Sequence, residues 1–132
     1  MSEPVDTERN KQIVLDYYQT AFSGNPEKAV ADHFGPHYVQ HNPEAKDGPE
    51  AFIGFVHYLR GEFPNLVLDI KRVIAEGDMV VTHSHLDLEP ADPSHAGQAL
   101  ADYFRLENGK VVEHWDVIQP VPLTAANKNG MF

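Results

Sequence analysis

The 132-residue chain has no cysteine. This absence excludes disulfides, thiolate metal ligands and cysteine nucleophiles in one step. Any chemistry that the protein performs must therefore use carboxylate, imidazole, phenol or amide groups.

Basic residues are also scarce, because ten lysines and arginines stand against twenty acidic residues and give a formal net charge of −10. Nucleic acid and anionic membranes both require a basic surface, so we expect neither as a partner. The apolar runs are only a few residues long, too short to cross a bilayer. The first ten residues, MSEPVDTERN, lack the basic start and apolar stretch of a secretory signal. We therefore expect a cytoplasmic protein.

What remains is the composition of an ordinary globular protein, with 42% hydrophobic and 23% charged residues, well away from disorder. The length predicts a single domain over residues 1–132, with an ordered core from about residue 7 to residue 120.

The first half of the sequence predicts three helices. Residues 7–22 carry apolar side chains at the spacing of one helix face, with Asp6 or Thr7 as the cap. A second helix follows Asn25, with Pro26 at its first position, and a third begins at Pro49 and ends near residue 61. The segment PHYVQHNP between the last two predicts a short strand that runs into a turn.

The second half changes to strand-like alternation and predicts two hairpins. Residues 66–75 and 79–88 form the first, and residues 98–106 and 110–119 form the second, around the Asn108-Gly109 turn. Helices first and antiparallel strands last predict an α+β fold, with the helices on one face of a bent sheet. The sequence has no strand-helix alternation, phosphate loop or nucleophile elbow, so dinucleotide-binding and common hydrolase folds have no support.

Two strands of the second hairpin carry ionisable residues where apolar ones are expected. Strand side chains alternate between faces, so His114 and Asp116 share one face while Trp115 lies on the other, toward an expected dimer interface. On the partner strand, Asp102 is the one charge on the more apolar face, where burial would raise its pKa. Such a group is either an acid/base residue or a structural partner to a nearby donor.

If both aspartates point inward, they lie on one concave surface with His114, and two interacting acids can divide the roles of acid and base. The alternative is that Asp102 or Asp116 caps a loop or pairs with Arg105 or Arg72 at a subunit interface.

The other candidate residues lie on two further segments. His83 and His85 share one strand face and could ligate zinc or iron together with His41 or Asp116, but the same spacing suits the outer face of a half-exposed strand. At the end of the short strand, His41 could shuttle a proton, and the amides of Gln40 and Asn42 could bind a carbonyl or enolate. The Asn-Pro pair is also ordinary turn chemistry.

The order of elements, together with the motifs YVQHNP, GDMVVTHSH and DYFRLENGKVVEHWDVIQP, resembles the nuclear transport factor two-like superfamily. Within it, the chain is similar to the SnoaL-like polyketide cyclase group, in the branch described as predicted aldol-condensation enzymes, from residue 13 to about residue 120. The resemblance implies a cone-shaped roll of three N-terminal helices on a strongly curved, mainly antiparallel sheet, and a homodimer through the outer sheet face. It also implies a pocket between helices and sheet.

Many members of this superfamily work without metal or cofactor, through an aspartate or histidine on the inner sheet surface, and others only bind ligands. By this resemblance Asp102 and Asp116 match the acidic sites of the last two strands, and His41 and His83 match motifs of the branch.

The sequence therefore predicts an enzyme without cofactor or metal that abstracts a proton next to a carbonyl of a small apolar substrate, leading to aldol cyclisation or isomerisation. The alternatives are a ligand-binding protein of the same fold and a metal-dependent enzyme that uses His83 and His85. The expected catalytic residues are Asp102, Asp116, His41, His83 and His114. The expected substrate-binding residues are Tyr18, Gln40, Asn42, Phe55 and Phe104.

Overall fold

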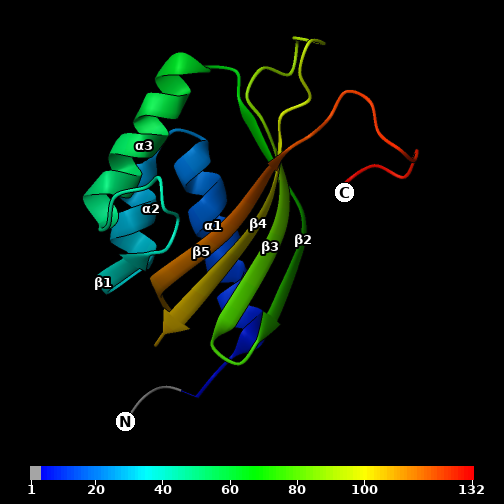
Figure 1. The fold of residues 1–132 in the computed structure, drawn as a ribbon. Helices are drawn as coiled ribbons and strands as arrows, with labels where there is room; N and C mark the ends of the chain where they lie inside the picture. Colours follow the sequence, from blue (N-terminus) through cyan, green and yellow to red (C-terminus); the bar gives the residue numbers. More distant parts are fainter. Residues whose placement is uncertain (1–3) are drawn as a thin grey trace.

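The structure is a computed structural model that describes residues 4–132. Its helices are α1 (Thr7–Phe22), α2 (Pro26–His33) and α3 (Pro49–Glu62) (Figure 1). The caps expected from the sequence are in place: Asp6 accepts a hydrogen bond from the Arg9 N–H, and Asn25 accepts one from the Lys28 N–H. The three predicted helices are thus confirmed.

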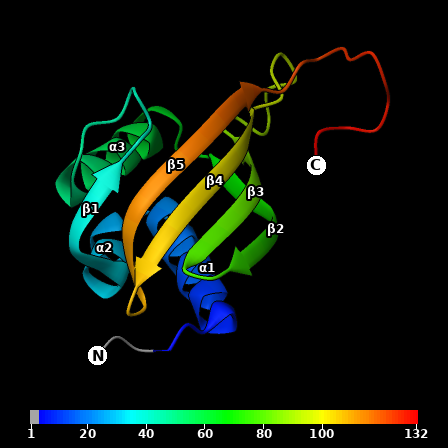
Figure 2. The ribbon, with the colours of Figure 1, turned by 60° about the horizontal axis from the view of Figure 1, so that its bottom comes forward.

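Five strands follow the predicted pattern: β1 (Phe34–Gln40), β2 (Val67–Glu76), β3 (Met79–Asp87), β4 (Gln98–Glu107) and β5 (Lys110–Pro120). They form one sheet in the order β1-β5-β4-β3-β2, in which β1 pairs parallel to β5 and the other pairs are antiparallel (Figure 2). The turn between β4 and β5 has positive φ at both Asn108 (51°) and Gly109 (76°), as an Asn-Gly hairpin turn requires.

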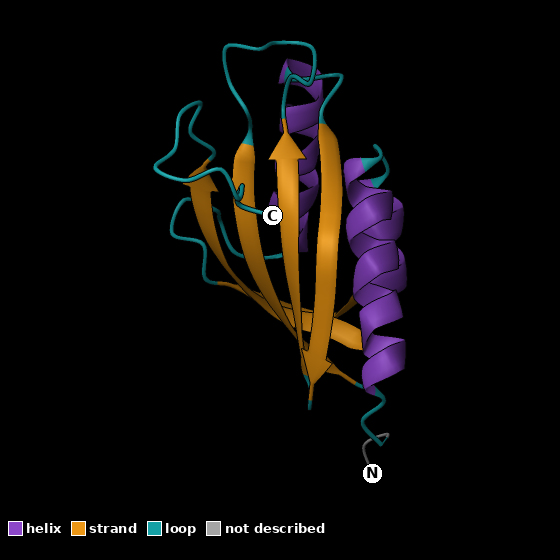
Figure 3. Ribbon diagram, turned by 90° about the vertical axis from the view of Figure 1, so that its right-hand side faces the viewer, coloured by secondary structure: helices purple, strands orange, loops and turns teal. Residues whose placement is uncertain are grey.

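The three helices cover one face of the curved sheet, and the C-terminal segment passes by the other (Figures 1 and 3). We call the helix-covered face the inner face and the opposite one the outer face. The core between helices and inner face is built on aromatic rings: Tyr17 contacts Phe34, Phe52 and Phe104 at centroid distances of 5.2, 5.5 and 5.7 Å. This is the predicted α+β architecture, and its inner face carries the polar residues described next.

Candidate active site

A row of polar side chains crosses the inner face from β3 to β5. Thr82 lies directly opposite Asp102, and Asp102 lies directly opposite Asp116. Thr82 and Asp102 are buried, at 0% and 1% exposure. His114, two residues before Asp116 on β5, is buried as well. The alternation read from the sequence therefore does bring Asp102, His114 and Asp116 together.

Asp102 and His114 form a buried pair, with His114 Nε2 2.8 Å from Asp102 Oδ1. The other ring nitrogen, Nδ1, lies 2.7 Å from Gln40 Oε1, which also accepts the backbone N–H of Asn42 at 3.1 Å. A backbone N–H can only donate, so this Gln40 atom is the oxygen and His114 Nδ1 carries a hydrogen. Nε2 and Asp102 Oδ1 then share one proton, either as carboxylic acid and imidazole or as carboxylate and imidazolium.

Burial is the largest influence on the ionisation of Asp102 and raises the pKa of its carboxyl, although the hydrogen bond to His114 acts in the opposite direction. Burial likewise raises the pKa of the Tyr18 phenol, and the charge of Asp102 adds to this effect. Tyr18 therefore stays a neutral phenol beside the pair. Phe104 packs on the same histidine, with its ring centroid 5.1 Å from that of His114.

Asp116 has a different environment from Asp102. The Asn42 side-chain nitrogen donates to both of its oxygens, at 2.9 and 3.1 Å, and Asn42 Oδ1 accepts the Glu44 N–H, which fixes the amide orientation. His114 Nε2 is 3.9 Å from Asp116 Oδ2. The side chain of Asp116 is 12% exposed, against 1% for Asp102, so Asp116 is the more accessible acid.

The end of β1 supplies both amides. Gln40 pairs in register with His114 on β5, and the His41 N–H donates to the His114 carbonyl, so the backbone sets the two amides over the inner face. The Gln40 side-chain nitrogen also donates to the Tyr38 hydroxyl at 3.3 Å.

His83, one of the expected catalytic residues, does not lie with the two aspartates. His83 shares the outer face of β3 with His85, because Thr82 and Ser84 take the buried inner positions. His83 Nδ1 contacts the Arg72 guanidinium, and His85 Nε2 donates to the Ala96 carbonyl at 2.6 Å. Within the described part of the chain, neither belongs to a group of three side chains placed to hold a metal ion.

His41 also turns to the outer face. Its ring stacks on Trp115, with centroids 4.7 Å apart and planes at 1°, and its Nε2 lies 2.6 Å from Glu113 Oε2. Phe55 is 49% exposed on α3. The structure thus groups Tyr18, Gln40, Asn42 and Phe104 around the pair of aspartates and leaves His41, His83 and Phe55 outside this group.

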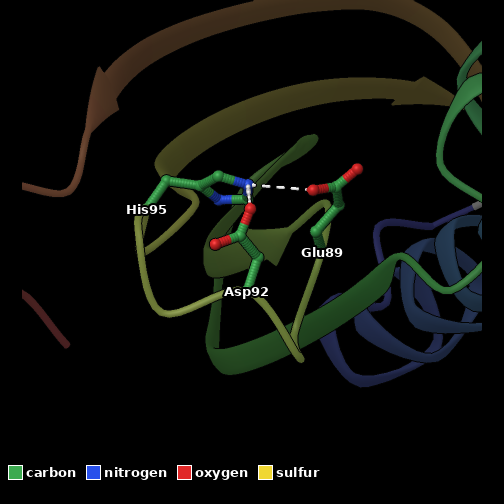
Figure 4. Close-up of side chains that lie close together, drawn as sticks. All are labelled: Glu89, Asp92 and His95. Atoms are coloured by element: carbon green, nitrogen blue, oxygen red, sulfur yellow. Dashed lines mark hydrogen bonds and ion pairs between the residues drawn. The ribbon is translucent and has the colours of Figure 1, made fainter.

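Two groups of side chains have the spacing of metal ligands within the described residues. One is Asp102, His114 and Asp116. The other, Glu89, Asp92 and His95, lies on the loop between β3 and β4 (Figure 4), where His95 Nε2 is 3.3 Å from Glu89 Oε2 and 3.5 Å from Asp92 Oδ2. These three side chains are 39 to 45% exposed and pair with one another, as ordinary surface residues do.

The sequence prediction missed Thr82 and Ser84 on β3. The available signal was alternation with Val80 and Leu86, since a face that is apolar at both ends is the buried one. His83 and His85 alternate with these residues, and the prediction placed candidate site residues on the histidine face instead.

A curved five-stranded sheet covered by three helices is the architecture of the nuclear transport factor two-like fold. Within this fold, the chain belongs to the SnoaL-like polyketide cyclase family, whose model matches residues 12–127. No curated protein matches the chain significantly.

Solved structures share the fold at low sequence identity. TsrD from Streptomyces laurentii is 21% identical over 87% of this chain and 91% of its own, with a TM-score of 0.71. AclR from Streptomyces galilaeus is 21% identical over 86% and 91%, with a TM-score of 0.69. A SnoaL-like protein from Jannaschia sp. CCS1 is 21% identical over 89% and 90%, with a TM-score of 0.68. At these identities the likeness establishes the fold alone.

None of the helices in the described residues has the length and apolar character needed to span a membrane.

Proposed function

We propose that the protein is a small-molecule enzyme that abstracts a proton from a carbon next to a carbonyl group and needs no cofactor. The observation that carries the proposal is the unequal environment of two neighbouring aspartates. Asp102 is buried and shares a proton with His114, whereas Asp116 is partly accessible and accepts hydrogen bonds through both oxygens. Two carboxyl groups in such different surroundings suit the separate roles of acid and base.

In the proposed reaction Asp116 is the base. Its carboxylate takes the proton from the carbon, and the electron pair of the broken C–H bond forms the enolate double bond. The carbonyl oxygen, which gains the negative charge, accepts the proton shared by His114 and Asp102 and a hydrogen bond from the Asn42 amide. In an aldol cyclisation the enol carbon attacks a second carbonyl carbon, the enol O–H proton returns to the His114–Asp102 pair, and the proton held by Asp116 passes to the new alkoxide. In an isomerisation Asp116 delivers its proton to another carbon, and the enol O–H proton returns to the same pair.

Gln40 and Tyr18 support this arrangement without touching the reacting atoms. Gln40 keeps a hydrogen on Nδ1 of His114, so that Nε2 is the nitrogen that exchanges a proton with Asp102. Tyr18 remains a neutral phenol in the apolar wall, because burial raises its pKa. Both are positioning residues.

The proposal includes the homodimer and the cytoplasmic location expected from the sequence. Exposed apolar side chains on the outer sheet face support the dimer, among them Tyr103 (37% exposed) and Val117 (65%). Light scattering of the purified protein tests it, and a monomer at micromolar concentration would contradict it.

Deuterium exchange tests the reaction directly. Ketones with acidic α-hydrogens are incubated in D₂O with the protein, and NMR follows the loss of the α-proton signal. Acid/base groups contribute about 10²- to 10⁴-fold to such steps, so we expect Asp116→Asn to slow exchange by at least about 100-fold. Asp78→Asn, on the exposed β2–β3 turn, is the matched control and should exchange at the wild-type rate. Undiminished exchange in both Asp102→Asn and Asp116→Asn would refute the proposal. A ligand that binds without any exchange would favour a binding protein.

A further inference from the structure

Three buried polar atoms have no hydrogen-bond partner in the described part of the chain: Thr82 Oγ1, Ser84 Oγ and Asp102 Oδ2. Thr82 and Ser84 are both 0% exposed, and Asp102 is 1% exposed. All three lie on the inner face of two neighbouring strands. Buried polar groups without partners are rare in folded proteins, so three at one place require an explanation.

The register of the sheet gives their position relative to the reacting groups. Thr82, Asp102 and Asp116 form one row across β3, β4 and β5, and Ser84 lies in the next inner-face row, opposite Leu100. Strands lie about 4.8 Å apart, so Thr82 is roughly 10 Å from Asp116 across two strand spacings. The two hydroxyls therefore sit on the far side of Asp102 from the proposed base.

The folded protein gains nothing from these hydroxyls by itself. Leaving a buried hydroxyl unpaired costs stability, and valine or alanine would fill the same positions without this cost. A partner that the free chain does not supply, such as a bound molecule, would account for their presence.

We propose that Thr82 and Ser84 form a subsite that binds a second oxygen of the substrate, an inference that rests on the proposed function of Asp116 and deepens it. The second oxygen is a hydroxyl or carbonyl and carries no charge, because the subsite is buried, its own groups are neutral, and the cross-strand neighbour of Thr82 is acidic. The substrate class is an apolar carbonyl compound with two oxygen groups at opposite ends of a skeleton of about two fused rings. Thr82 and Ser84 are then specificity-determining residues for one end, and Asp116 acts at the other.

A pair of probes that differ by one oxygen tests the subsite: 6-hydroxy-1-tetralone and its parent 1-tetralone. Calorimetry measures the affinity for each, and the ratio of the two affinities is the readout. A site that hydrogen-bonds a hydroxyl rejects the analogue that lacks it, so we expect the wild-type protein to prefer the hydroxylated probe by about tenfold or more. The double variant Thr82→Val, Ser84→Ala should bring this ratio to about one. Thr124→Val, which changes an exposed residue of the C-terminal segment, is the control and should keep the wild-type ratio.

Urea unfolding shows whether the double variant folds. Because the two hydroxyls have no partner in the free protein, we expect its midpoint to be equal to or above that of the wild type. A lower midpoint would overturn the inference, since it would mean that the hydroxyls are satisfied within the fold. An unchanged affinity ratio in the double variant, or binding of neither probe by the wild type, would overturn it as well.

Failure of the subsite and failure of the proposed reaction give different results. The affinity ratio is measured without turnover, so a ratio that depends on Thr82 and Ser84 supports the subsite even if neither probe exchanges deuterium. Deuterium exchange that depends on Asp116, together with an affinity ratio that the double variant leaves unchanged, supports the reaction and excludes the subsite. A crystal structure of the complex in which the two hydroxyls hydrogen-bond only to a water molecule would also exclude the subsite.

Discussion

Replacing Gln40 by methionine, which has a similar length and volume, tests whether this residue fixes the protonation of His114. Gln40 Oε1 accepts two hydrogen bonds, at 2.7 Å from His114 Nδ1 and at 3.1 Å from the Asn42 N–H. His114 is buried, and a buried ring nitrogen left without a partner, whether as donor or as acceptor, costs about 1–3 kcal/mol. Asn42 is half-buried, so water can replace part of the second bond and its loss costs about 0.5–1 kcal/mol. We therefore expect Gln40→Met to lower the free energy of unfolding by about 1.5–4 kcal/mol.

Urea unfolding followed by circular dichroism measures this loss, with Gln119→Met on the exposed end of β5 as the matched control. The nitrogen chemical shifts of the His114 ring measure the protonation itself. In the wild-type protein we expect a protonated Nδ1, and in Gln40→Met we expect the hydrogen to move to Nε2, where it donates to Asp102. A wild-type ring with a bare Nδ1, or a Gln40→Met protein as stable as the control, would refute the reasoning about the shared proton.

Three further changes probe other parts of the molecule. Burial raises the pKa of Asp102 above its ordinary 3.8, so the protonated carboxyl stabilises the folded protein fully below pH 3.8, and this stabilisation is lost as the pH rises through the folded pKa. The urea midpoint of the wild type should therefore fall over this pH range, and the midpoint of Asp102→Asn should not show this fall. Gly35→Ala should destabilise the fold by about 1–3 kcal/mol, because the new Cβ would lie 2.7 Å from the buried Val112 side chain. Gly54→Ala, at a position in α3 with open space around it, should instead stabilise the fold by about 0.5–1 kcal/mol. Thermal unfolding measures both effects.

The fold could be predicted closely because its signals are local. Asp6, Asn25 and Pro26 determine where helices begin, and the Asn108-Gly109 turn determines one hairpin, all within a few residues of the structure they cause. Alternation placed Asp102 on the more apolar face of its strand and His114 on one face with Asp116, and it left their inward position as one of two alternatives. The hairpin implied that these faces would meet, but the hydrogen bond between Asp102 and His114 was not predicted.

The rest of the site depends on contacts that no local pattern contains. On β3 the flanking Val80 and Leu86 mark the hydroxyl face as the inner one, but no local pattern shows that Thr82 comes to lie opposite Asp102. His41 follows Gln40 directly, so alternation alone turns it away from Gln40, but its stacking on Trp115 requires the parallel pairing of β1 with β5. A parallel contact between distant segments leaves no turn signal in the sequence.

That parallel pairing has a consequence for how the protein is made. Asn42 and Asp116 are 74 positions apart, as are Gln40 and His114. Closing so long a loop is entropically costly and comes late in folding. On the ribosome, the helices and the first hairpin emerge and can collapse before β5 exists, and until then Gln40 and Asn42 lack His114 and Asp116, their partners on β5. Each newly made copy therefore acquires the site only after its last strand has left the exit tunnel, so a chain cut short before β5 would lack the site.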